Sequence, residues 1–295
     1  MGAKDKLDIR VLGLLCQTYL RRCLPDDWMV RLGYRRYYGR WPNLSRPKLF
    51  SEKIAWRKLH ERTELMVRLS DKVQAKEEIR ARVGDAYVTP NLWVGDRPEE
   101  IPFDRLARPY IVKLASSSGG HLVIREGDPL PDRRRLREMA LRLRIGHGWQ
   151  MREWAYRRIP PRILVEPLHE TQGDGAPTDY RFFVFRGKAR LVHANCESDE
   201  DGRGTIYERD WQLSRYGFVS QPVRPKIARP EKLEEMLAIA ERIAEGFEFM
   251  RVDLYLVNGR ILFSEATLYP WGGLKRLAPP EWDQELGAMW DSEEK

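Results

Sequence analysis

Charged side chains recur at alternate positions of two strand-like segments near the C-terminus. In the segment 247–257, Arg251 and Asp253 point to one side and apolar residues to the other, because successive side chains of a strand alternate. In the next strand Glu265 and Thr267 share a face. Two carboxylates on one face repel each other as bare anions, whereas together they offer the hard oxygen ligands that Mg²⁺ prefers. A salt-bridged surface hairpin is the alternative.

The turn between these strands decides whether the two carboxylates meet. A two-residue Asn258-Gly259 turn would pair Asp253 with Ser264 and place Glu265 on the opposite face. A three-residue turn with glycine in the left-handed region adds one residue and brings both carboxylates to one side. Since a shared magnesium site needs the second geometry, we predict the three-residue loop.

A second candidate site is the stretch VKLASSSGGHLVI, in which Lys113 ends a strand-like run. Glycines allow backbone N–H groups to approach phosphate oxygens closely, and a lysine adds a positive charge. The stretch does not match the Walker A pattern, and an ordinary hairpin turn is the alternative. The loop that we expect to bind phosphate consists of Ser116, Ser117, Ser118, Gly119 and Gly120.

The remaining patterns predict the elements that must position these residues. The first 70 residues have mainly helical patterns, and from Asp71 onward helical and strand patterns alternate, which indicates an α/β or α+β fold. RPYIVKLASSSGGHLVIREGD predicts a strand, a loop and a strand, and TDYRFFVFRGKARLVHAN predicts a hairpin turning at Gly187. Expected helices are 70–84, capped by Ser70 and Asp71, the Arg-rich 131–145, and 230–247 with Pro230 as first helical residue.

Composition limits the classes of partner. The 295 residues carry a formal charge of +8, which favours anionic ligands, but no zinc-finger or RNP signature supports nucleic acid. No apolar run is long enough to span a membrane, and no secretory signal is evident. The three cysteines (Cys16, Cys23 and Cys196) lack metal-site spacing and suit reduced cytosolic thiols. We therefore expect a cytoplasmic protein without a membrane span or nucleic-acid partner.

Seven stretches in order resemble the TupA-like ATP-grasp family, named for teichuronopeptide biosynthesis. They are RPKLFSEKIAWRKL, LSDKVQAKEEI, YIVKLASSSGG, REWAYRRIPPRILVEPL, DYRFFVFRGKARLV, RVDLYLVNGRILFSEAT and WDQELG, and they cover roughly residues 31–287. The resemblance implies an α+β ATP-grasp fold, in which two α+β lobes sandwich the nucleotide. It implies a mainly helical region at 1–70, the small lobe with the phosphate loop at 71–165, and the large lobe with the metal strands at 166–295.

The resemblance also implies nucleotide contacts, with ATP and Mg²⁺ as cofactors. Lys72 and Lys113 would hold ATP phosphates, and the loop Ser117–Gly120 would close over the β- and γ-phosphates. The hinge at Glu166 would receive adenine, with backbone groups of Pro167 and His169 at the base edge, and Asp179 would bind ribose hydroxyls.

For catalysis, the resemblance implies that Arg251, with Lys113, neutralises charge on the transferring phosphate. Asp253 and Glu265 would ligate one or two Mg²⁺ ions, with Thr267 where most ATP-grasp enzymes place Asn. Trp271 follows the metal strand, where the family places the acceptor site.

The implied activity is carboxylate–amine ligation through an acyl phosphate, with ATP converted to ADP and phosphate. The family's name suggests an acidic or glycan-linked carboxylate of a cell-surface or cell-wall polysaccharide, joined to an amine such as an amino acid or peptide. One alternative is an ATP-grasp phosphotransferase acting on a sugar hydroxyl, and another is a non-catalytic basic binding protein. A homodimer is compatible with the resemblance.

Overall fold

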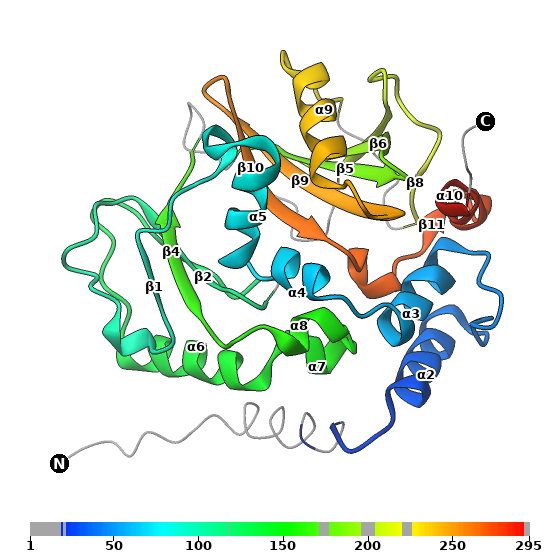
Figure 1. The fold of residues 1–295 in the computed structure, drawn as a ribbon. Helices are drawn as coiled ribbons and strands as arrows, with labels where there is room; N and C mark the ends of the chain where they lie inside the picture. The colour runs from blue at the N-terminus through cyan, green and yellow to red at the C-terminus, as the bar shows by residue number, and fades with distance from the viewer. Residues whose placement is uncertain are drawn as a thin grey trace.

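A computed structural model describes residues 19, 22–117, 119–170, 177–195, 204–219 and 226–291. Two antiparallel sheets form its centre, with helices on and between them, so the expected α+β class is confirmed. Figure 1 shows the smaller sheet, with β2 and β4, and the larger sheet, with β5, β9 and β10, on either side of helix α5 (Gln74–Val83).

The smaller sheet has the strand order β1-β4-β2-β3. Its strands are β1 (Trp93–Gly95), β2 (Tyr110–Leu114), β3 (Leu122–Ile124) and β4 (Ile163–Pro167). Helix α6 (Arg133–Ile145) is capped by the Asp132 carboxylate and contributes Met139 and Leu143 to the core of this sheet. The predicted strand–loop–strand segment and the Arg-rich helix are therefore confirmed.

The larger sheet has the order β10-β9-β5-β6-β7. Its strands are β5 (Asp179–Phe185), β6 (Lys188–Asn195), β7 (Thr205–Glu208), β9 (Phe249–Val257) and β10 (Arg260–Thr267). The β5–β6 hairpin turns at Gly187, whose φ of 78° is left-handed, as predicted. A short ribbon pairs β8 (Gly217–Phe218) with β11 (Leu277–Ala278).

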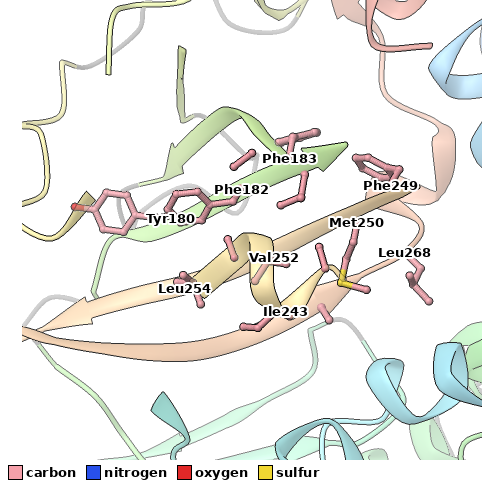
Figure 2. Packing of buried hydrophobic residues seen from close by; sticks show 14 of the residues in the cluster. Tyr180, Phe182, Phe183, Ile243, Phe249, Met250, Val252, Leu254 and Leu268 are labelled. Carbon is pink, nitrogen blue, oxygen red and sulfur yellow. The ribbon is translucent and has the colours of Figure 1, made fainter. Parts of the chain in front are cut away.

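Helix α9 (Leu233–Ile243) covers one face of the larger sheet. Phe182 pairs with Val252 across the sheet, and both belong to the buried cluster that includes Ile243 of α9 (Figure 2). Fully burying such side chains contributes about 1.5–3 kcal/mol each. The expectation that Pro230 is the first helical residue is wrong, because Leu233 N–H bonds to the Pro230 carbonyl in a turn that precedes the helix.

The other helices surround the two sheets. They are α2 (Asp26–Tyr38), α3 (Phe50–His60), α4 (Glu64–Ser70), α5 (Gln74–Val83), α7 (His147–Met151), α8 (Trp154–Arg158) and α10 (Glu281–Asp291). Short 3₁₀ turns lie at η1 (Asp85–Tyr87), η2 (Pro98–Glu100) and η3 (Pro270–Gly273).

The helix expected from Ser70 to Gly84 begins later than predicted. Ser70 ends α4, and the Asp71 carboxylate accepts a hydrogen bond from Val73 N–H in the turn between the helices. A competing side-chain bond of this kind favours a turn over helix. The helix does end at Gly84, as expected.

Candidate active site

The turn between β9 and β10 contains two residues, not three. Val257 pairs directly with Arg260, and both intervening residues are left-handed, with φ of 49° at Asn258 and 70° at Gly259. Positive φ at both positions is the requirement of a tight hairpin turn, which Asn-Gly meets at low cost. The prediction of a three-residue loop is therefore wrong.

A β-bulge at Ser264 supplies the extra residue instead. Phe263 pairs with Leu254, the register then shifts by one residue, and Glu265 pairs with Asp253. Two residues later Thr267 pairs with Arg251. An extra residue in one strand reverses the alternation beyond it. The bulge therefore places both carboxylates on one face. This shared face was predicted, but from a three-residue turn and not from a bulge.

Arg251 joins the residues of this face. Its guanidinium donates to both carboxylate oxygens of Asp253, at 2.8 Å and 2.6 Å, and to Thr267 Oγ1 at 3.1 Å. Burial and the Asp179 carboxylate raise the pKa of Asp253 to about 6, although Arg251 and Arg181 lower it. The negative charge of Asp253 is thus incompletely balanced in spite of its arginine, which suits a site that also receives a cation.

Lys72 links Glu265 to the Ser/Gly loop. Its ammonium group lies 3.5 Å from Glu265 Oε1 and donates to the Ser117 carbonyl at 2.9 Å. Tyr156 also reaches Glu265, with 3.4 Å between its hydroxyl and Oε1. Burial raises the pKa of Glu265, but Lys72 and Arg251 lower it further, so the net direction is downward and the side chain is anionic.

The loop itself has the backbone conformation that glycine permits. Gly119 and Gly120 both have left-handed φ, at 76° and 71°. Ser118 lies outside the described residues. A guanidinium nitrogen of Arg142, from α6, lies 3.1 Å from the point where a Cβ on Gly120 would stand. Arg142 was not predicted as a neighbour of this loop, since nothing in the Arg-rich helix distinguishes it from the other arginines.

Lys113 does not stand alone at the end of β2. Its ammonium lies 2.6 Å from Glu166 Oε2, and Lys76 contacts the other carboxylate oxygen. Burial raises the pKa of Glu166, but the two lysines lower it more, to about 2. Lys76 was not predicted as part of this site. It lies four residues after Lys72 in a segment of helical pattern, and this spacing could have indicated that the two lysines share a helix face.

The predicted hinge and ribose residues lie at neighbouring strand ends. Pro167 ends β4 opposite Tyr110, and His169 Nε2 lies 2.8 Å from Thr89 Oγ1. Asp179 begins β5, where its Oδ2 accepts from Arg181 at 2.8 Å. Its Oδ1 is buried and, among the residues that the structure describes, has no hydrogen-bond partner, so it is an open acceptor on the same face as Asp253.

Trp271 lies next to the arginine of this polar face. Its backbone is left-handed, with φ of 51°, and its ring packs near Phe183, Phe218 and His193. The Arg251 guanidinium lies 5.7 Å from the ring centroid. The turn that holds Trp271 is anchored by Lys58, a buried lysine that donates to the Gly272 carbonyl at 2.6 Å.

The donor set fits a divalent ion shared with a ligand better than a fully protein-bound one. Within the described part of the chain, no group of three or more His, Cys, Asp or Glu side chains could hold a metal. Asp253 and Glu265 supply two carboxylates, and Thr267 a hydroxyl. Mg²⁺ commonly takes one or two carboxylates together with phosphate oxygens and waters, so two acids are enough beside a nucleotide.

Two antiparallel sheets, a Gly-rich loop with lysines, and paired acids beside an arginine are the arrangement that the ATP-grasp resemblance implies. A profile of the family described as "TupA-like ATPgrasp" matches residues 52–291. The chain therefore belongs to the TupA-like ATP-grasp family. No curated protein shows significant similarity to it.

Solved ligases are distantly similar. A D-alanine–D-alanine ligase from Bacillus anthracis, complexed with ATP, is 16% identical with a TM-score of 0.39, over 68% of this chain and 55% of that one. The Helicobacter pylori D-alanine–D-alanine ligase is 14% identical with a TM-score of 0.45, over 84% and 68%. The ATP-grasp ligase PsnB, complexed with a phosphomimetic precursor variant, Mg and ADP, is 12% identical with a TM-score of 0.40, over 82% and 66%.

None of the helices in the described ranges combines the length and apolar character needed to traverse a bilayer.

Proposed function

We propose that this protein is an ATP-dependent ligase that joins a carboxylate to an amine through an acyl phosphate. The observation that carries the proposal is the register of β9 and β10, in which Glu265 lies opposite Asp253 while Arg251 binds Asp253 and Thr267. Two acids and an arginine on one buried face can hold Mg²⁺ and neutralise phosphate oxygens together.

Each side chain has a role that follows from its position. In this proposal, Lys72, which lies between Glu265 and the Ser/Gly loop, and Lys113, which lies beside Glu166, bind ATP phosphates. Arg251 stabilises the charge that develops as the substrate carboxylate attacks the γ-phosphate. Asp253, Glu265 and Thr267 would hold a Mg²⁺ ion, which would neutralise charge on the phosphate oxygens.

The nucleotide base and ribose have separate contacts in this proposal. Glu166, Pro167 and His169 lie at the end of β4, where the adenine edge would meet backbone groups. The unpartnered Asp179 Oδ1 is an acceptor for a ribose hydroxyl. The loop residues Ser117, Ser118, Gly119 and Gly120 would cover the β- and γ-phosphates through backbone N–H groups.

Phosphorylation makes the carboxylate reactive, because the acyl phosphate has a good leaving group where a bare carboxylate has none. The amine then displaces phosphate, and an amide forms. Alignment and exclusion of water are the protein's main contributions. We further propose a cytoplasmic reaction on an acidic precursor of a cell-surface polysaccharide, in keeping with the charge of +8.

The test is a screen of amino acids and uronic acids, as carboxylates and as amines, for substrate-dependent release of phosphate and ADP. Mass spectrometry of the product should show an amide, with one ADP and one phosphate released for each bond. ADP formation without free phosphate, together with a phosphorylated product, would instead identify a phosphotransferase and exclude the ligase.

A further inference from the structure

Helix α2 carries a row of exposed apolar side chains. Trp28 is 60% exposed and Leu32, one turn later, is 42% exposed, so both lie on one face of the helix. Leu24, just before the helix, and Trp41, just after it, are 41% and 52% exposed. In the described part of the chain, ten large apolar side chains are exposed, and five of them fall between residues 19 and 41, so this exposure is concentrated around α2.

The opposite face of α2 already has its partners. Val30 and Tyr34 are buried in a small cluster with Leu44 and Ala55. The packing of α2 on α3 therefore accounts for its inner face and leaves Trp28 and Leu32 outside the core. In Figure 1, α2 lies at the margin of the molecule, beside α3.

Positive charge surrounds the exposed row. Residues 22–41 contain five arginines and two aspartates. Asp26 is engaged by Arg152 and Arg157, and Asp27 by Arg31. Arg35 stacks over Trp41, with its guanidinium 4.6 Å from the ring centroid. Neither Arg35 nor Arg36 forms an ion pair with an acid in the described ranges.

We propose that the α2 face, defined as Leu24, Trp28, Leu32, Arg35, Arg36 and Trp41, docks the protein on an anionic membrane surface. Tryptophan prefers the bilayer interface, where its ring is buried in part and its N–H stays hydrated. Arginines at the same level bind lipid phosphates. A helix with an apolar row flanked by unpaired cations has the pattern of an interfacial helix, which lies on the membrane and does not cross it.

Docking through α2 would also bring the active site close to the bilayer. A cavity of about 230 Å³ lies between α2 and the turn after β10, lined by Leu32 and Arg36 on one side and by Gly272 and Gly273 on the other. Leu32 and Arg36, at the edge of the proposed membrane surface, therefore also border the segment that follows the acidic strand. The docking proposal does not depend on the ligase reaction and can be tested without substrates.

The test is sedimentation of the full chain with vesicles of phosphatidylcholine alone or mixed with phosphatidylglycerol. Wild type should bind the anionic vesicles, and rising salt should weaken the binding. Arg35→Gln/Arg36→Gln should bind about thirty-fold more weakly, since each basic side chain near such a surface contributes about 1 kcal/mol. Trp28→Ala/Leu32→Ala should weaken binding at least about ten-fold.

Two matched variants control for general effects. Arg133→Gln/Arg134→Gln removes two exposed arginines from the basic helix α6, and Leu213→Ala removes an apolar side chain that is 54% exposed on another surface. Both should bind as wild type does, and thermal unfolding should confirm that every variant is folded. The proposal is overturned if wild type ignores anionic vesicles, if the α2 variants bind normally, or if the α6 variant loses as much. Wild type could instead self-associate in a concentration-dependent way without binding vesicles, and Trp28→Ala/Leu32→Ala could abolish that association. This result would assign the α2 face to contact with a second copy of the chain and would also overturn the membrane proposal.

Discussion

Replacing Glu166 by glutamine tests the electrostatics of the ion pairs that join it to Lys76 and Lys113. Glutamine keeps the shape of the side chain but removes the charge that holds Lys113 and Lys76. The pKa of Glu166 is lowered from 4.5 to about 2, so its ion pairs contribute stability that is fully present above pH 4.5 and lost as pH falls through 2. At about 1.4 kcal/mol for each pH unit, this lowering is worth about 3 kcal/mol at pH 7.

The assay is urea unfolding of wild type and Glu166→Gln at pH 7 and at pH 3, without nucleotide. The difference between the two proteins should be about 3 kcal/mol or more at pH 7, because the variant also leaves the buried Lys76 and the half-buried Lys113 without this carboxylate. This difference should be about 2 kcal/mol smaller at pH 3, because the carboxyl group of the unfolded chain is then protonated while the native carboxylate, with its lowered pKa, is still mostly ionised, so that folding must release a proton. Glu77→Gln, exposed on the same helix as Lys76, should change little at either pH. An equal loss of unfolding free energy at both pH values would refute the reasoning, since it would show that the charge of Glu166 does not contribute to stability.

Two further outcomes follow from contacts elsewhere. Gly287→Ala should destabilise the protein by about 3 kcal/mol in urea unfolding, because the new Cβ would lie 1.9 Å from the Lys48 carbonyl oxygen. Gly33→Ala, at a helical glycine with open space around it, should instead stabilise the protein by about 0.5–1 kcal/mol. If both substitutions changed the free energy of unfolding in the same direction, the steric clash inferred at Gly287 would be contradicted. Lys72→Met should weaken ATP binding about ten- to a hundred-fold, because a charged hydrogen bond is lost, and calorimetry can measure this change. Lys232→Met, on the surface before α9, should leave ATP binding unchanged. Equal affinities for wild type and Lys72→Met would remove Lys72 from the nucleotide site.

The sequence allowed the paired acids to be predicted, but not the backbone that pairs them. Alternation of side chains placed Arg251 and Asp253 on one face, because a strand has a fixed period of two. Asn-Gly is the strongest signal for a two-residue turn, and it does form that turn at Asn258-Gly259. The bulge at Ser264 has no comparable signature, since a serine in a strand carries no conformational requirement of its own. The Asn-Gly rule favoured the turn that forms, but the prediction set it aside for a three-residue loop in order to keep both carboxylates on one face. The bulge at Ser264 makes the two-residue turn and the shared face compatible.

Contacts between segments far apart in the sequence were harder to predict. Lys113 was a candidate for phosphate because it ends a strand before the Ser/Gly loop, but its pairing with Glu166 depends on the packing of β2 against β4. The same applies to Lys76, which comes from α5, and to Arg142, which comes from α6. Long-range placement of this kind follows from how the elements pack, and spacing along the chain does not contain it.

The central claim is that Asp253 and Glu265 together hold the Mg²⁺ that accompanies ATP. Calorimetric titration with a non-hydrolysable ATP analogue, in Mg²⁺ and in EDTA, tests it most directly on wild type, Asp253→Asn and Glu265→Gln. The account predicts that Mg²⁺ tightens binding to wild type, and that either substitution removes this gain while the protein stays folded. Wild type that binds the analogue equally well without Mg²⁺, or variants that keep the full gain, would contradict it.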